Sequence, residues 1–74
     1  MGSLENVLVL KTNISTKNQV EKLNFILSSH PKVSQWNIDL EDVDCVLRIV
    51  STTITYHEVT DLVAQLGYFC CELE

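Results

Sequence analysis

The stretch TYHEVTDLVAQLG, Thr55–Gly67, has the features of a complete amphipathic helix with its start and its end. Thr55 and Glu58 have the spacing of a capping box, in which each side chain accepts a hydrogen bond from a backbone N–H of the first turn. Apolar residues then recur at helical spacing, and Gly67 can adopt the left-handed conformation that ends many helices. The apolar stripe consists of Val59, Leu62, Val63 and Leu66.

A second helical pattern lies earlier in the chain and cannot continue through Pro31. Its buried face is expected to contain Val20, Leu23, Ile26 and Leu27. Its solvent side is expected to contain Lys17, Glu21, Lys22 and Asn24.

Four other segments have the composition or the alternation of β-strands. They are NVLVLKT (6–12), KVSQWNIDL (32–40), CVLRIV (45–50) and YFCCEL (68–73). Alternation predicts that Leu8, Leu10 and Thr12 share one face, as do Trp36, Ile38 and Leu40 in the second strand and Cys45, Leu47 and Ile49 in the third. The polar segment 41–44 is expected to be a turn.

The element order is therefore strand, helix, strand, strand, helix, strand. With right-handed crossovers this order predicts an α+β fold, the ferredoxin-like βαββαβ sandwich, in which an antiparallel four-stranded sheet has both helices on one face. We expect a single domain over residues 1–74 with a core of about 6–73; Met1–Ser3 and Leu73–Glu74 can be cloning additions and are given no function.

Composition limits the possible functions. The chain has 74 residues and a formal net charge of −5, so nucleic acid is not an expected partner. No apolar run reaches the length of a membrane span and no signal peptide is recognised, which predicts a cytoplasmic protein with no membrane contact. Three cysteines, two of them adjacent, do not suit a disulfide framework.

Several short motifs, taken together, resemble those of heavy-metal-associated domains, the fold of copper chaperones and of the N-terminal modules of metal pumps. They are KTNI (11–14) before the first helix, IL…HPKV (26–33) at its end, WNID (36–39) in the second strand and LGY (66–68) before the last. The resemblance covers about residues 8–73 and is closest to a small bacterial variant with Lys-Thr-Asn before the metal loop.

The resemblance implies a metal site at the first turn of the first helix, where the family has two cysteines in a CxxC motif that bind Cu(I). Thr16 and Gln19 occupy those places here, and neither offers the thiolate that a soft metal requires. Ile14 occupies the place of the family's methionine. Thr16 and Gln19 have capping-box spacing instead, with Ser15 as a rival N-cap, so we expect a degenerate site with no cofactor.

The sequence contains two other groupings of potential metal ligands. A non-standard Cu(I) or Zn(II) site could combine His30 and His57 with Cys70 or Cys71, although adjacent strand residues point to opposite faces and the spacing does not force convergence. The acidic residues Asp39, Glu41, Asp42 and Asp44 lack the spacing of a calcium loop. We expect the latter to form a solvated turn.

The remaining candidate surface is the open face of the sheet. Alternation places on this face Val7, Val9, Lys11, Val46, Arg48 and Val50, with Cys70 as a further candidate. A contiguous apolar patch of this kind is typical of a surface that binds a protein partner or a second copy of the chain.

No catalytic constellation and no phosphate-binding loop is present, so we expect a non-enzyme. The leading interpretation is a protein-interaction or regulatory module related to metal-transport chaperones. The alternative is a Cu or Zn binding protein with a non-standard His/Cys site. A small-ligand regulatory domain shares the element order, but the glycine-containing first loop of such domains is missing.

Overall fold

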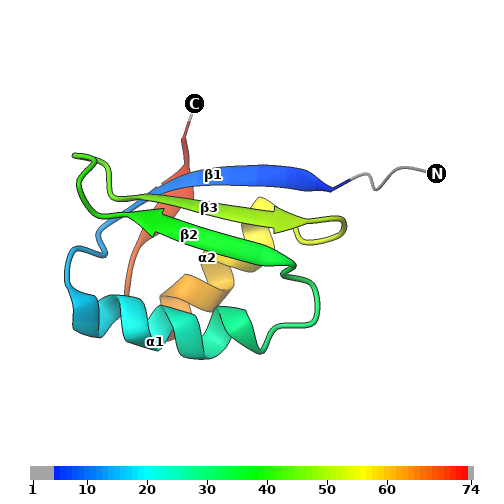
Figure 1. The fold of residues 1–74 in the computed structure, drawn as a ribbon, viewed down its shortest axis with the longest axis horizontal. Helices are drawn as coiled ribbons and strands as arrows, with labels where there is room; N and C mark the ends of the chain where they lie inside the picture. The colour runs from blue at the N-terminus through cyan, green and yellow to red at the C-terminus, as the bar shows by residue number, and fades with distance from the viewer. Residues whose placement is uncertain (1–4, 74) are drawn as a thin grey trace.

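The computed structural model describes residues 5–73 and has the predicted element order. The strands are β1 (Asn6–Thr12), β2 (Gln35–Asp39), β3 (Val46–Ser51) and β4 (Cys70–Glu72), and the helices are α1 (Lys17–Ser28) and α2 (Tyr56–Gln65). The sheet has the order β2-β3-β1-β4 with antiparallel neighbours. Both helices cover the same face of the sheet (Figure 1). The expected α+β ferredoxin-like sandwich is confirmed.

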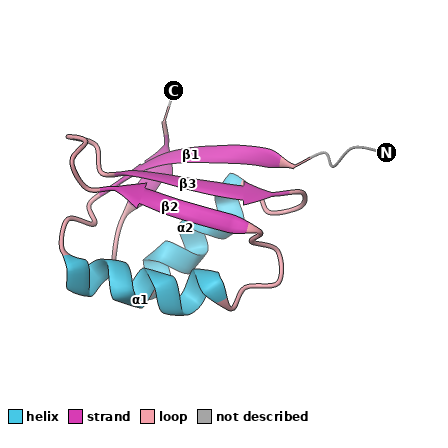
Figure 2. Cartoon of the chain, in the orientation of Figure 1, coloured by secondary structure: helices cyan, strands magenta, loops and turns pink. Residues whose placement is uncertain are grey.

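Figure 2 shows the sheet and the helices as two layers, and the core is formed between them. It is formed by side chains that point inward from both layers. They are Leu8, Leu10, Ile14, Leu23, Leu27, Leu47, Ile49, Ile54, Val59, Val63 and Cys70. The predicted apolar stripes of both helices thus face this core, with Leu23 and Leu27 buried on α1 and Val59 and Val63 buried on α2.

The predicted start and end of α2 are both confirmed. The Thr55 side chain accepts a hydrogen bond from Glu58 N–H, and the Glu58 carboxylate accepts one from Thr55 N–H. At the other end Gly67 has φ of 85°, Gly67 N–H donates to Ala64 O, and Tyr68 N–H donates to Val63 O. These two bonds form a Schellman motif, which satisfies carbonyl groups that the helix leaves unpaired.

The sequence predicted Cys45 as the first residue of the third strand, but the structure places it outside that strand. It precedes β3 and has φ of 46°, in the left-handed region. The turn extends one residue further than expected, because Cys45 N–H donates to Asp42 O and Asp44 N–H donates to the Asp42 carboxylate. The alternation that placed Cys45 beside Leu47 and Ile49 therefore does not apply to it.

The last strand is shorter than predicted. Tyr68 and Phe69 precede β4, and Phe69 is held by the segment before α1. Its N–H donates to the Asn13 side chain, and its carbonyl accepts from Asn13 N–H. This exchange brings the end of α2 beside the segment before α1. The Asp44 carbonyl, which accepts from Thr12 N–H, lies at the same end of the domain.

Candidate functional site

The segment Asn13–Thr16, which we call the α1 loop, lies directly before α1, where the sequence resemblance predicts a metal loop. Thr16 is the N-cap of α1 and has extended backbone angles. Its Oγ1 accepts from Gln19 N–H at 3.2 Å. Gln19 Oε1 accepts from Thr16 N–H at 3.1 Å and from Ser15 N–H at 2.8 Å. The predicted capping box is present, and Thr16 rather than Ser15 is the N-cap.

The α1 loop is also held in place by the core and by the segments before β3 and β4. Ile14 is fully buried in the core and its N–H donates to Thr12 Oγ1. The same Thr12 hydroxyl donates to Cys45 O at 2.8 Å, which connects the loop to the turn before β3. Hydrogen bonds of Asn13 to Phe69 connect it to the turn before β4. The loop therefore has tight backbone constraints on both sides and presents neutral oxygen groups already engaged with N–H donors.

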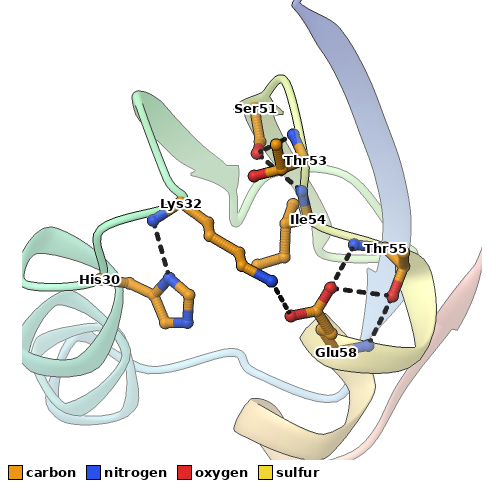
Figure 3. A network of polar contacts seen from close by, with 7 residues as sticks. All are labelled: His30, Lys32, Ser51, Thr53, Ile54, Thr55 and Glu58. Carbon is orange, nitrogen blue, oxygen red and sulfur yellow. Dashed lines mark hydrogen bonds and ion pairs between the residues drawn. The ribbon is translucent and has the colours of Figure 1, made fainter.

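The two histidines follow the end of α1 and the start of α2, away from the α1 loop at the start of α1; Figure 3 shows His30 beside Lys32. His30 follows α1, and its Nδ1 accepts from Lys32 N–H at 3.1 Å. His57 is in the first turn of α2 and its side chain is 86% exposed, with Nε2 3.4 Å from an Asp61 carboxylate oxygen.

The structure does not bring these histidines together with the cysteines. Cys70 pairs with Thr12 at the loop end of the sheet, and its side chain is buried 4.0 Å from Thr60 Oγ1. Burial raises the pKa of the Cys70 thiol, which disfavours the thiolate form that a metal needs. Within residues 5–73 no group of three or more His, Cys, Asp or Glu side chains could hold a metal ion. The acidic residues of the turn between β2 and β3 do not form such a group either.

One ion pair closes the histidine end of the sandwich. Lys32 Nζ lies 2.8 Å from Glu58 Oε2 and joins the α1–β2 connection to α2 (Figure 3). The hydrogen bond from Lys32 lowers the pKa of Glu58 below its ordinary value of 4.5. Glu58 also accepts from Thr55, so the same carboxylate holds the helix cap and the ion pair.

We expect acid to weaken this end of the domain. Because the folded-state pKa of Glu58 is lowered, its stabilising contribution is complete above pH 4.5 and is lost as the pH falls through the folded-state pKa. Lys32→Met should raise the pKa of Glu58 towards 4.5, measured by NMR titration of its side-chain carboxyl carbon. An unchanged Glu58 pKa in Lys32→Met would contradict the assignment of the shift to Lys32.

The open face of the sheet carries most of the residues predicted for it. Val7 is 55% exposed, Val9 and Val50 are half-buried, and Arg48 is exposed. Val7 pairs with Val50, and Arg48 pairs with Val9 on one side and with Asn37 on the other. Arg48 is therefore flanked on both sides in the middle of the face.

Two residues predicted for this open face do not contribute to it. Val46 is only 2% exposed, although it has the phase of the open face at the start of β3. Cys70 belongs to the core on the helix side. Its neighbour Cys71, half-buried and paired with Lys11, takes the open-face position by alternation.

The sequence-based interpretation missed an apolar surface on the helix layer. Phe25 on α1 is 80% exposed and lines an open groove with Ile26 and Leu66. A helical projection would have revealed it, because Phe25 is a large apolar residue that falls outside the stripe of Val20, Leu23, Ile26 and Leu27. Phe69 and Val43 are also largely exposed at the loop end.

Comparison with known proteins supports the fold and nothing finer. No protein-family model and no curated protein matches the chain. A solved structure described as the apo form of the HMA domain of copper chaperone for superoxide dismutase matches with a TM-score of 0.74 and 17% sequence identity, over 100% of this chain and 74% of that chain. The chain therefore has an HMA-like fold. No helix within residues 5–73 has the length and apolarity to cross a membrane.

Proposed function

We propose that this HMA-like domain is a protein-interaction or regulatory module that does not bind metal at the family's position. The observation that carries the proposal is the reciprocal capping box of Thr16 and Gln19. A hydroxyl and an amide oxygen that already accept backbone hydrogen bonds have neither the softness nor the charge to replace two thiolates. Transfer of Cu(I) by the family's mechanism therefore has no ligands in this loop.

The open sheet face is the surface that we assign to the partner. It combines exposed or half-buried valines with Arg48, which makes no ion pair within 4.0 Å among residues 5–73. An unpaired arginine between apolar side chains favours a partner whose apolar surface carries a carboxylate. A symmetric pair of open faces centred on Arg48 would instead oppose two like charges. We therefore favour a different protein over a second copy on this face.

A charge reversal on the face tests this assignment. Arg48→Glu should weaken a purified partner's binding by at least about tenfold, because truncation or reversal of a central buried charge pair costs more than 1.4 kcal/mol. Isothermal titration gives the affinity, and amide shifts place the contact. Phe25→Ala, on the helix layer, is the matched control and should bind normally. A partner lost with Phe25→Ala and retained with Arg48→Glu would contradict the assignment.

The alternative function, metal binding at a non-standard His/Cys site, is tested separately. A Zn(II) and Cu(I) titration under reducing conditions should show no stoichiometric uptake that depends on His30, His57 or Cys71. Uptake that is lost in both His57→Ala and Cys71→Ser would support the alternative and contradict the proposal.

A further inference from the structure

The groove on the helix layer is a surface that the proposed function does not use. It has a volume of about 630 Å³ and is lined by Asn18, Glu21, Lys22, Phe25, Ile26 and Leu66. Five of these residues come from α1 and Leu66 caps the end of α2. Ile26 and Leu66 are half-buried against the core, whereas Phe25 stands beside them with 80% of its surface exposed. The groove thus offers an apolar hollow and a protruding aromatic ring next to each other.

The charges of the groove are balanced, unlike those of the whole chain. It contains one acid, Glu21, and one base, Lys22, both exposed and neither in an ion pair within 4.0 Å among residues 5–73. The chain as a whole has a net charge of −5, so two copies repel each other on average. The groove itself, with one acid and one base, has no net charge and can match opposite charges of a second copy.

We propose that two copies of this chain associate through this groove as an isologous homodimer. In such a dimer the same patch must complement itself under a two-fold axis. If the two α1 helices cross in antiparallel fashion with the axis between residues 21 and 22, Glu21 of each copy faces Lys22 of the other. Phe25, one turn further along, then lies over Asn18 of the second copy.

Leu66, at the end of α2, completes the pocket for Phe25 of the second copy. The start of α1 and the end of α2 lie at the same end of the domain, because Asn13 and Phe69 exchange two hydrogen bonds there. Asn18 and Leu66 thus line the same groove near these two ends. Phe25 of one copy is buried by the other copy's Leu66, and the two-fold axis repeats this contact, so that both phenylalanines are buried.

The small size of the groove implies a weak affinity between the two copies. Six lining residues are far fewer than the 20–30 residues per side of a standard interface. We therefore infer a reversible dimer that forms at high protein concentration, in which two phenylalanines and two ion pairs provide most of the binding free energy.

Sedimentation equilibrium over a hundredfold range of concentration tests the inference. The mass of the wild-type chain should rise from 8.4 kDa towards twice that value. Phe25→Ala should raise the dimer dissociation constant at least tenfold without loss of fold, because this side chain is mostly exposed in the monomer. Phe69→Ala, which removes another exposed phenylalanine outside the groove lining, should leave the constant unchanged. A wild-type chain that stays monomeric, or equal effects of the two variants, would overturn the inference.

A charge exchange supplies the decisive comparison. Glu21→Lys should weaken the dimer, even though it reduces the chain's net charge from −5 to −3 (one −1 replaced by +1) and so reduces general repulsion. The double variant Glu21→Lys/Lys22→Glu restores the pairing and should restore the affinity. A stronger dimer in Glu21→Lys, or no recovery in the double variant, would overturn the model. Arg48→Glu should leave the dimer unchanged; a dimer lost in that variant would assign self-association to the sheet face.

Discussion

The double variant Thr16→Cys/Gln19→Cys should bind one Cu(I) per chain, whereas the wild-type chain should bind none at this position. The two residues are the N-cap and the third residue of α1, and each side chain accepts a hydrogen bond from the backbone N–H of the other residue. Cysteines at these positions offer two thiolates to a soft metal, and the helix N-terminus favours their ionised form. The resemblance of the α1 loop to the family's metal loop thus predicts a gain of function.

The measurement is a competition titration with a Cu(I) chelator under reducing conditions. It is best made in a Cys45→Ser/Cys71→Ser background, which removes the two half-exposed thiols and leaves buried Cys70 in place. Thr16→Ser/Gln19→Ser is the matched control, since it alters the same positions and adds no thiol. Cu(I) should raise the melting temperature of the cysteine variant alone, because a ligand that binds only the folded state stabilises it. A cysteine variant that fails to take up Cu(I) would show that the loop is not placed as a metal loop.

Ile14→Ala should lower the free energy of unfolding by about 2–5 kcal/mol, the usual cost of a large cavity in a core. Ile14 is fully buried although it belongs to the α1 loop. A domain of this length has a total stability of only about 4–11 kcal/mol, so the variant should lose a large share of it. Urea unfolding followed by circular dichroism measures the difference.

Ile14→Met is the matched control for this variant. Methionine nearly conserves the volume of the side chain and should cost less than about 1.5 kcal/mol. If the α1 loop were loosely packed, the two variants would differ little. A loss below about 1 kcal/mol in Ile14→Ala would therefore contradict the description of Ile14 as the anchor of this loop.

The features predicted correctly from the sequence are local ones. Thr16 and Gln19, like Thr55 and Glu58, lie three residues apart, and a capping box needs nothing beyond that spacing. Gly67 likewise ends α2 through its own left-handed conformation. The element order then left few topologies, and the observed strand order is among them.

The errors arose where tertiary contacts override a local pattern. Cys45 follows the strand alternation in sequence, but the turn before it takes up one residue more than expected. Val46 has the correct phase for the open face and still lies buried beside the turn. Cys70 and Cys71 were ambiguous because adjacent strand residues exchange faces when the register shifts by one.

Other features depend on residues that are far apart in the sequence. Lys32 and Glu58 are 26 positions apart, and the Asn13–Phe69 contact spans 56 positions. Neither pair has a pattern that a single sequence could reveal. The groove beside Phe25 also needs the end of α2 in place before its shape is defined.

We propose that the wild-type α1 loop is a capped helix start without metal affinity. The most direct test is a Cu(I) titration of the ¹⁵N-labelled wild-type chain under reducing conditions, followed by the amide shifts of residues 14–20. These amides should show no saturating shift at one equivalent of Cu(I), since the hydrogen bonds of the Ser15, Thr16 and Gln19 amides to the capping side chains remain in place. A shift that saturates at one equivalent in this segment would contradict the claim.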